Sequence, residues 1–143
     1  MRSLLTGTAA AALLVAAPVA AQADGQACES LASLALPNTT ITLARAVDAG
    51  AFTIPIAAGG TPPPTALVQA VSGLPAFCRV AATLKPSTDS DIKIEVWMPA
   101  SGWNGKFMAA GNGGWSGSIN YAQMVPILKR GYAVCRAAPM RRA

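Results

Sequence analysis

The sequence predicts an α/β fold, and three observations support this prediction. Residues 91–99 alternate apolar and polar side chains, which is typical of a strand with one buried face. A short apolar strand at 106–110 leads into a glycine-rich loop, and a helical pattern follows over 118–131. A new apolar run then begins at Tyr132. Strand, helix and strand in this order form a βαβ unit, and such units build parallel sheets covered by helices.

The first half of the chain predicts one short helix and two strands. Residues 27–36 place apolar side chains on one helical face, and the pattern ends before Pro37. Residues 39–47 are rich in β-branched side chains and predict a strand. A loop rich in glycine and proline covers 57–64, and a second strand at 76–84 runs into a polar turn.

The second half predicts a hairpin followed by the βαβ unit. The turn at 101–105 contains Asn-Gly, which is a strong hairpin signal. In the helix expected over 118–131, Ser118 is a suitable N-cap and Gly131 suits the position after the last turn. Pro126 predicts a kink, because proline cannot donate a helical hydrogen bond.

The first 23 residues resemble a secretory signal peptide. Arg2 supplies the positive charge, residues 4–17 are apolar, and Ala21-Gln22-Ala23 is a cleavage site of the small-x-small type. The alternative, a retained membrane anchor, fits less well because the apolar run is short and rich in alanine. We therefore expect a mature chain that begins near Asp24 and resides in the periplasm or outside the cell.

The net charge of +5 does not indicate a nucleic-acid-binding protein. Arg2, Arg136, Arg141 and Arg142 lie near the two ends, and without these four the chain carries only +1. No basic stripe with interleaved aromatic residues is present, so a nucleic-acid partner is not expected. The chain has no histidine, which excludes a Ser-His-Asp triad or a histidine-ligated metal within this sequence.

The chain has three cysteines, and export predicts that two of them pair. Cys28 and Cys78 are the favoured pair because both lie in well-patterned sequence. A disulfide that closes a loop of this length is worth roughly 4 kcal/mol in the chain-entropy model. The alternative is that both remain buried thiols. Cys135 is the unpaired cysteine in the favoured arrangement.

The glycine loop between strand 106–110 and the following helix is the most unusual local feature. Gly111, Gly113, Gly114 and Gly117 fall within seven residues, so the backbone turns sharply or approaches another group closely. One interpretation is a dinucleotide-binding loop, whose amides would hold a pyrophosphate. Ser116 stands where the third glycine of that motif is expected, and no acidic residue ends the next strand.

Two other interpretations of the loop remain open. In an oxyanion-hole loop, a backbone N–H stabilises the developing oxyanion, and glycine lets the substrate approach. Alternatively, the loop is a tight packing turn beneath Trp115. Glycine spacing alone favours the packing turn.

Five sequence blocks, in the same order, resemble the N-terminal region of the tannase/feruloyl esterase family. The blocks are 77–80 (FCRV), 94–99 (IEVWMP), 103–107 (WNGKF), 111–115 (GNGGW) and 130–134 (RGYAV). The resemblance extends over about residues 25–134. It implies an exported serine carboxylic-ester hydrolase with an α/β-hydrolase fold, acting on esters of phenolic acids and needing no cofactor or metal.

The resemblance assigns one element of a catalytic site to this chain. It implies that Gly111, Asn112, Gly113 and Gly114 form an oxyanion-hole loop, with Gly113 as the favoured donor. It also implies the Cys28–Cys78 disulfide. Trp97 and Trp103 are expected to be packing residues rather than substrate contacts, because strand and turn aromatics usually fill cores.

The resemblance stops after Val134. The family continues with Ser-Thr-Asp and Gly-His stretches, whereas this chain reads CRAAPMRRA over 135–143, which we interpret as an out-of-frame tail. The expected domains are therefore a signal peptide at 1–23, the N-terminal part of an α/β-hydrolase at 24–134, and the tail. The nucleophile elbow and triad would lie beyond it.

On this interpretation, the chain carries a partial α/β-hydrolase fold truncated before the nucleophile elbow, and it is inactive and prone to aggregation. The alternative is a small exported non-catalytic binding domain.

Overall fold

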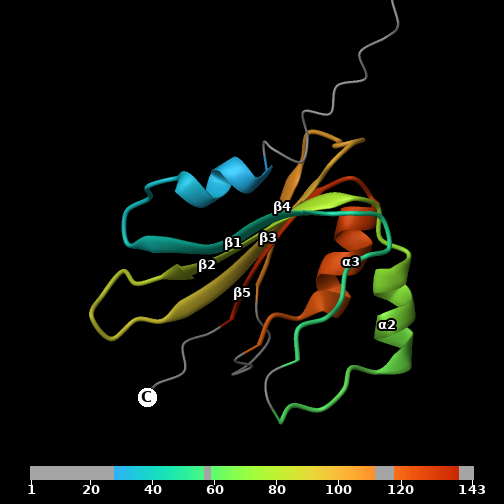
Figure 1. The fold of residues 1–143 in the computed structure, drawn as a ribbon, viewed down its shortest axis with the longest axis horizontal. Coiled ribbons are helices and arrows are strands. Elements are labelled where there is room, and N and C mark those ends of the chain that lie inside the picture. The colour runs from blue at the N-terminus through green and yellow to red at the C-terminus, as the bar shows by residue number, and fades with distance from the viewer. Residues whose placement is uncertain (1–27, 57–58, 112–117, 139–143) are drawn as a thin grey trace, which may run out of the picture.

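The computed structural model describes residues 28–56, 59–111 and 118–138, and these form one mixed β-sheet with helices on its faces (Figure 1). The sheet has five strands in the order β1-β2-β3-β5-β4. The strands are β1 (Thr39–Val47), β2 (Phe77–Leu84), β3 (Ile92–Pro99), β4 (Phe107–Ala110) and β5 (Ala133–Ala138). The predicted α/β class is confirmed, and each predicted strand is present.

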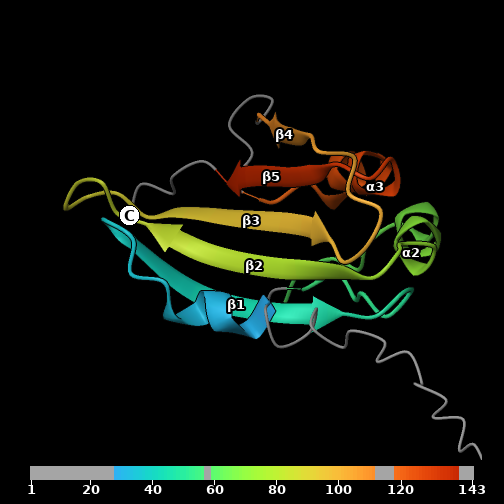
Figure 2. The same ribbon diagram turned by 90° about the horizontal axis from the view of Figure 1, so that it is seen from above.

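Strands β1, β2 and β3 form an antiparallel meander, and β3 also pairs antiparallel with β5. Only β4 and β5 are parallel, with Phe107 opposite Ala133 and Ala110 opposite Arg136. Figure 2 shows β4 at the edge of the sheet, beside β5. The predicted βαβ unit is therefore present, but it is joined to an antiparallel meander rather than to further parallel strands.

Two helices cover one face of the sheet (Figure 1). Helix α3 (Tyr121–Lys129) is the crossover between β4 and β5, and it contains Pro126 without ending there. Helix α2 (Thr65–Ser72) was not predicted. A signal for it exists, because apolar residues recur at helical spacing up to the buried Val71 and Gly73 follows the last turn.

The other face carries the N-terminal segment, which a disulfide holds against the sheet. Residues 28–30 are helical and continue into the 3₁₀ turn η1 (Leu31–Ser33), so the expected helix over 27–36 is shorter than predicted. Cys28 and Cys78 form a disulfide with their Cα atoms 5.6 Å apart. This is the pairing that the sequence favoured, and Cys135 is a free cysteine.

The core lies between the sheet and the helices α2 and α3, and aromatic rings dominate it. Phe52, Phe77 and Trp97 pack edge to face or tilted, with centroids 4.8 to 5.9 Å apart. Trp97 is fully buried, so its predicted packing role is confirmed. The same prediction is wrong for Trp103, which is 60% exposed and donates its indole N–H to the Lys106 carbonyl within its own turn.

The boundary expected between the domain and its tail falls inside a strand. Strand β5 runs through Val134 and continues to Ala138, so the first four residues of the expected tail are paired in the sheet. The signal peptide and residues 139–143 lie outside the described residues. Among the residues that the structure describes, no helix has the length and hydropathy needed to cross a bilayer.

Candidate functional site

The glycine loop leaves the sheet at the carboxyl end of β4 and returns to it through α3. Because β4 and β5 are parallel, their carboxyl ends lie side by side, and Ala110 is paired with Arg136 there. In open α/β sheets, ligands bind outside the carboxyl ends of the parallel strands. The strand–loop–helix connection predicted from the sequence therefore lies at the edge of the sheet where a substrate site is expected.

Of the four residues assigned to the oxyanion loop, the structure describes Gly111 only. Gly111 is exposed, and a Cβ built on it would meet no atom within 4 Å. Its backbone position is therefore open, as a close approach by a ligand would need. Asn112, Gly113 and Gly114 lie outside the described residues, so their role stays a prediction.

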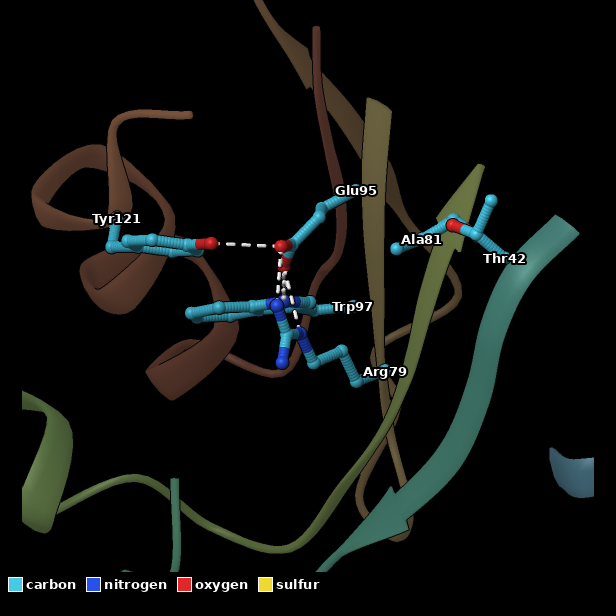
Figure 3. Close-up of polar contacts among 6 residues, drawn as sticks. All are labelled: Thr42, Arg79, Ala81, Glu95, Trp97 and Tyr121. Atoms are coloured by element: carbon cyan, nitrogen blue, oxygen red, sulfur yellow. Dashed lines mark hydrogen bonds and ion pairs between the residues drawn. The ribbon is translucent and has the colours of Figure 1, made fainter. Parts of the chain in front are cut away.

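A buried carboxylate lies close to the start of α3, where the loop rejoins the described fold. Glu95 on β3 accepts two hydrogen bonds from Arg79 on β2, at 3.0 Å from Nε and 2.5 Å from Nη2 (Figure 3). It also accepts the Trp97 indole N–H at 3.0 Å and the Tyr121 hydroxyl at 2.7 Å. We call these four residues the Glu95 cluster. Its carboxylate therefore accepts four hydrogen bonds from two strands and one helix.

The electrostatics of the Glu95 cluster agree with this geometry. Burial would lower the pKa of Arg79, but the hydrogen bonds and negative charge of Glu95 outweigh burial and raise it. Burial raises the pKa of Tyr121, and the nearby Glu95 carboxylate raises it further. Arg79 thus stays charged and Tyr121 stays neutral at physiological pH, which keeps the ion pair intact.

The Glu95 cluster holds the start of α3 in place and is not suited to act as a catalytic base. Its carboxylate is fully occupied and 5% exposed, so it has no free oxygen to act as a general base. Tyr121 is the first residue of α3, and its ring stacks on Trp97 at 5.7 Å with an interplanar angle of 11°. The cluster therefore fixes the start of α3, three residues after the described segment resumes at Ser118.

The sequence analysis missed the Glu95 cluster. A signal was available, because Arg79 and Glu95 are charged residues inside otherwise apolar strands. Charges at such positions are rarely fully buried unless they are paired. The pairing itself depends on the register that places Arg79 opposite Trp97 and next to Glu95 on one face of the sheet.

The hairpin turn and the end of α3 form a second supporting contact. Asn104 donates its side-chain amide to the Arg130 carbonyl at 2.9 Å, and its backbone N–H bonds the Gly131 carbonyl at 2.9 Å. Gly131 has φ of +77°, and a Cβ there would lie 2.7 Å from the Gly102 carbonyl oxygen. Only glycine fits this position without strain. Two blocks of the resemblance that are distant in sequence therefore meet in space.

An apolar groove lies at the opposite end of the sheet from the glycine loop. Its volume is about 440 Å³. It lies beside the disulfide and is lined mainly by Leu31, Val47, Phe77, Met98 and Pro99, with Asp48 as its one acidic residue.

Comparisons with known proteins agree with this architecture. No family model matches the chain. An uncharacterised esterase of Xanthomonas campestris is 42% identical over 130 residues, which is 91% of this chain and 20% of that protein. Feruloyl esterase C of Talaromyces stipitatus is 32% identical over 111 residues, which is 77% of this chain and 20% of that protein.

Solved structures give the same result. The crystal structure of feruloyl esterase B from Aspergillus oryzae superposes with a TM-score of 0.63 at 30% identity, over 80% of this chain and 21% of that one. A second esterase structure from Aspergillus oryzae gives a TM-score of 0.61 at 26% identity, over 80% of this chain and 22% of that one. The chain spans about a fifth of the length of the relatives it matches.

The mixed sheet with its parallel β4–α3–β5 unit matches part of the α/β-hydrolase-like fold of these esterases. More narrowly, the chain belongs to the feruloyl esterase/tannase-type family. The resemblance noted in the sequence is therefore confirmed.

Proposed function

We propose that this chain supplies the oxyanion loop, and the sheet that carries it, to a serine carboxylic-ester hydrolase acting on esters of phenolic acids. The observation that supports this proposal is the homology to feruloyl esterases over four-fifths of the chain. The loop follows β4 at the carboxyl edge of the parallel strands, where a backbone N–H could reach a substrate carbonyl.

The 143-residue chain by itself is expected to be inactive. It contains no histidine, so it has no general base of the Ser-His-Asp type. The measurement is hydrolysis of methyl ferulate and methyl gallate by the purified chain. Turnover above the rate in buffer would contradict this part of the proposal.

A chimera tests the role of the loop. Residues 28–134 would replace the matching region of feruloyl esterase B from Aspergillus oryzae. We expect the chimera to hydrolyse methyl ferulate, and Gly113→Val to lower its kcat by about 10²- to 10³-fold, because the branched side chain keeps the substrate carbonyl away from the backbone N–H. The control is Gly73→Ala, at the end of α2, where the nearest contact is the flexible tip of Lys129. Equal kcat values for both variants would contradict the assignment of the loop.

Export is part of the same proposal. The Cys28–Cys78 disulfide fits an oxidising compartment, since disulfides are rare in the cytosol. We propose cleavage of the signal peptide after Ala23. Amino-terminal sequencing of the exported protein would give Asp24 as its first residue, and a chain that starts at Met1 would contradict cleavage.

The interpretation of 135–143 as an out-of-frame tail stays a prediction. Sequencing the gene across this region tests it, because a shifted frame should continue with Ser-Thr-Asp. A peptide that spans Val134 to Arg136 in the exported protein would instead support the sequence as written.

A small non-catalytic binding domain is the second candidate function. The apolar groove beside the disulfide is the observation that favours it. A chain that remains monomeric, unfolds cooperatively and binds an apolar ligand in this groove would support that function.

A further inference from the structure

Arg136 on β5 is a buried cation that forms no ion pair with a described residue. It is 3% exposed, and its Nη1–H donates to the side-chain oxygen of Gln123 on α3. Its Nε has no hydrogen-bond partner among the residues that the structure describes. A buried guanidinium whose partner among the described residues is a neutral amide is costly, because buried charges are normally paired with charges of opposite sign.

Each carboxylate among the described residues either bonds another group or lies in another part of the fold from Arg136. Glu95 lies directly opposite Arg136 in strand register, but its hydrogen bonds go to Arg79, Trp97 and Tyr121. The others are Glu29 against Ala46, Asp48 at the groove, and Asp89 and Asp91 in the turn between β2 and β3. Within the described residues, Arg136 therefore has no carboxylate within ion-pair distance.

The first turn of α3 adds to the positive potential that two guanidiniums, Arg79 and Arg136, create around the single Glu95 carboxylate. The helix has nine residues, no acidic residue in its first turn, and no hydrogen bond from the side chain of its N-cap, Asn120. The amino end of a helix carries a partial positive charge and attracts anions. Gln123 lies in this first turn and bonds Arg136, so the positive guanidinium and the positive helix end lie close together and would attract the same anion.

A ligand can displace the Gln123 side chain from Arg136. Gln123 and Asn120 are exposed, so the amide can rotate into solvent and open the guanidinium to an incoming group. The amide oxygen of Gln123 then marks the position of one oxygen of a carboxylate. A carboxylate matches a guanidinium in charge and in the spacing of its two oxygens.

We propose that Arg136 and the first turn of α3 form a binding site for a small carboxylate, which displaces the side chain of Gln123. Arg136 lies beyond the sequence blocks shared with the esterase family, and binding is measured without turnover. Arg136 lies within 135–143, so the site requires the sequence as written and falls if this stretch proves to be out of frame; it does not depend on esterase activity.

Gln123→Glu tests the site without any added ligand. This substitution attaches a carboxylate at the atom that now bonds Arg136, so we expect the unfolding equilibrium constant to fall by about tenfold or more. Part of that gain comes from the helix end alone. A double-mutant cycle with Arg136→Met isolates the direct contact. The control is Gln69→Glu, on the exposed part of α2, which we expect to leave stability unchanged.

Ligand binding is tested with sodium benzoate, against sodium chloride at equal ionic strength. We expect benzoate to raise the thermal midpoint of the full chain in a saturable way. The concentration for half of this effect should increase by about tenfold or more in Arg136→Met. Gln123→Glu should show no benzoate effect, because its own carboxylate fills the site. Arg45→Met, on the exposed side of β1, should respond like the unmodified chain.

Several results would overturn the proposal. One is an equal response of the unmodified chain to benzoate and to chloride. Another is an unchanged benzoate response in both Arg136→Met and Gln123→Glu. Stabilisation by inorganic phosphate but not by benzoate would overturn the assignment to a carboxylate. If Arg136→Met does not fold, the benzoate response of Gln123→Glu against that of Gln69→Glu still decides the question, because only the former should lose it.

Discussion

At the scale of single residues, the most informative side chain is Glu95. Its two oxygens accept hydrogen bonds from Arg79, Trp97 and Tyr121, so one carboxylate joins two strands to the first residue of α3. Arg79 also lies over the ring of Phe52, at 5.2 Å from its centroid. The Arg79 guanidinium therefore lies between the Glu95 carboxylate and the ring of Phe52, and it contacts both.

Glu95→Gln should destabilise the chain strongly. Removing one member of a buried ion pair leaves Arg79 without its counter-charge, which costs about 3 kcal/mol. Urea unfolding followed by tryptophan fluorescence measures the change. The control is Asp91→Asn, which removes the ion pair with Lys93 at an exposed site and should leave the midpoint unchanged. Equal effects of both substitutions would contradict a special role for Glu95.

Tyr121→Phe removes the hydroxyl bonded to Glu95 and keeps the ring stacked on Trp97, so it measures the hydroxyl's contribution to stability. The folded-state pKa of Tyr121 is raised above its ordinary value of 10.0, mainly by burial and then by Glu95. Its contribution to stability is therefore fully present below pH 10 and is lost as pH rises further. Unfolding curves at pH 8 and above pH 10 should show a difference between the unmodified chain and Tyr121→Phe that narrows in alkali. A pH-independent difference would argue against the hydrogen bond to Glu95.

At the scale of secondary-structure elements, the N-terminal segment depends on its disulfide. Besides that bond, Glu29 accepts the Ala46 N–H, and Leu36 forms a β-bridge with Thr39. Leu34 and Leu36 are about half exposed, so burial contributes little there. The disulfide closes a loop with a sequence separation of 50 residues and is the main attachment of this segment.

Replacing both Cys28 and Cys78 by serine should lower the unfolding free energy by roughly 4 kcal/mol in the chain-entropy model. Chemical denaturation of the double variant measures this loss. Cys135→Ser is the control, because Cys135 is not paired. In the unmodified chain, burial raises the pKa of the Cys135 thiol, so alkylation before reduction should be slow and should label this cysteine alone.

At the scale of the whole molecule, the sheet presents an apolar edge. Strand β4 lies at the end of the strand order, where Phe107 is 60% and Met108 38% exposed. Edge strands with exposed apolar side chains pair readily with other chains. The relatives are about four to five times as long, and in this chain the edge strand leads into the glycine loop.

Phe107→Lys should reduce self-association of the chain. A charge on an edge strand opposes pairing with a second copy, so light scattering at micromolar concentration should decrease. Leu34→Lys is the control, because Leu34 is 50% exposed but lies outside the sheet. An equal decrease in both variants would indicate a general effect of charge on solubility and not a contribution of the edge.

The sequence by itself determined the class of fold, the five strands, the crossover helix and the family. These depend on local patterns: alternation in 91–99, the glycine loop before α3, and Gly131 at the end of the helix. It also favoured the Cys28–Cys78 pair. It missed α2, whose eight residues follow a run of prolines and have no capping side chain.

Only the tertiary structure decided which distant residues meet. The order of strands places β5 between β3 and β4, which brings Arg136 beside the first turn of α3 and Glu95 within hydrogen-bond distance of Tyr121. No local pattern contains this information, because it depends on the register of strands that are far apart in the chain. Trp97 and Trp103 show the difference: both are tryptophans near strand ends, yet the fold buries one completely and leaves the other 60% exposed.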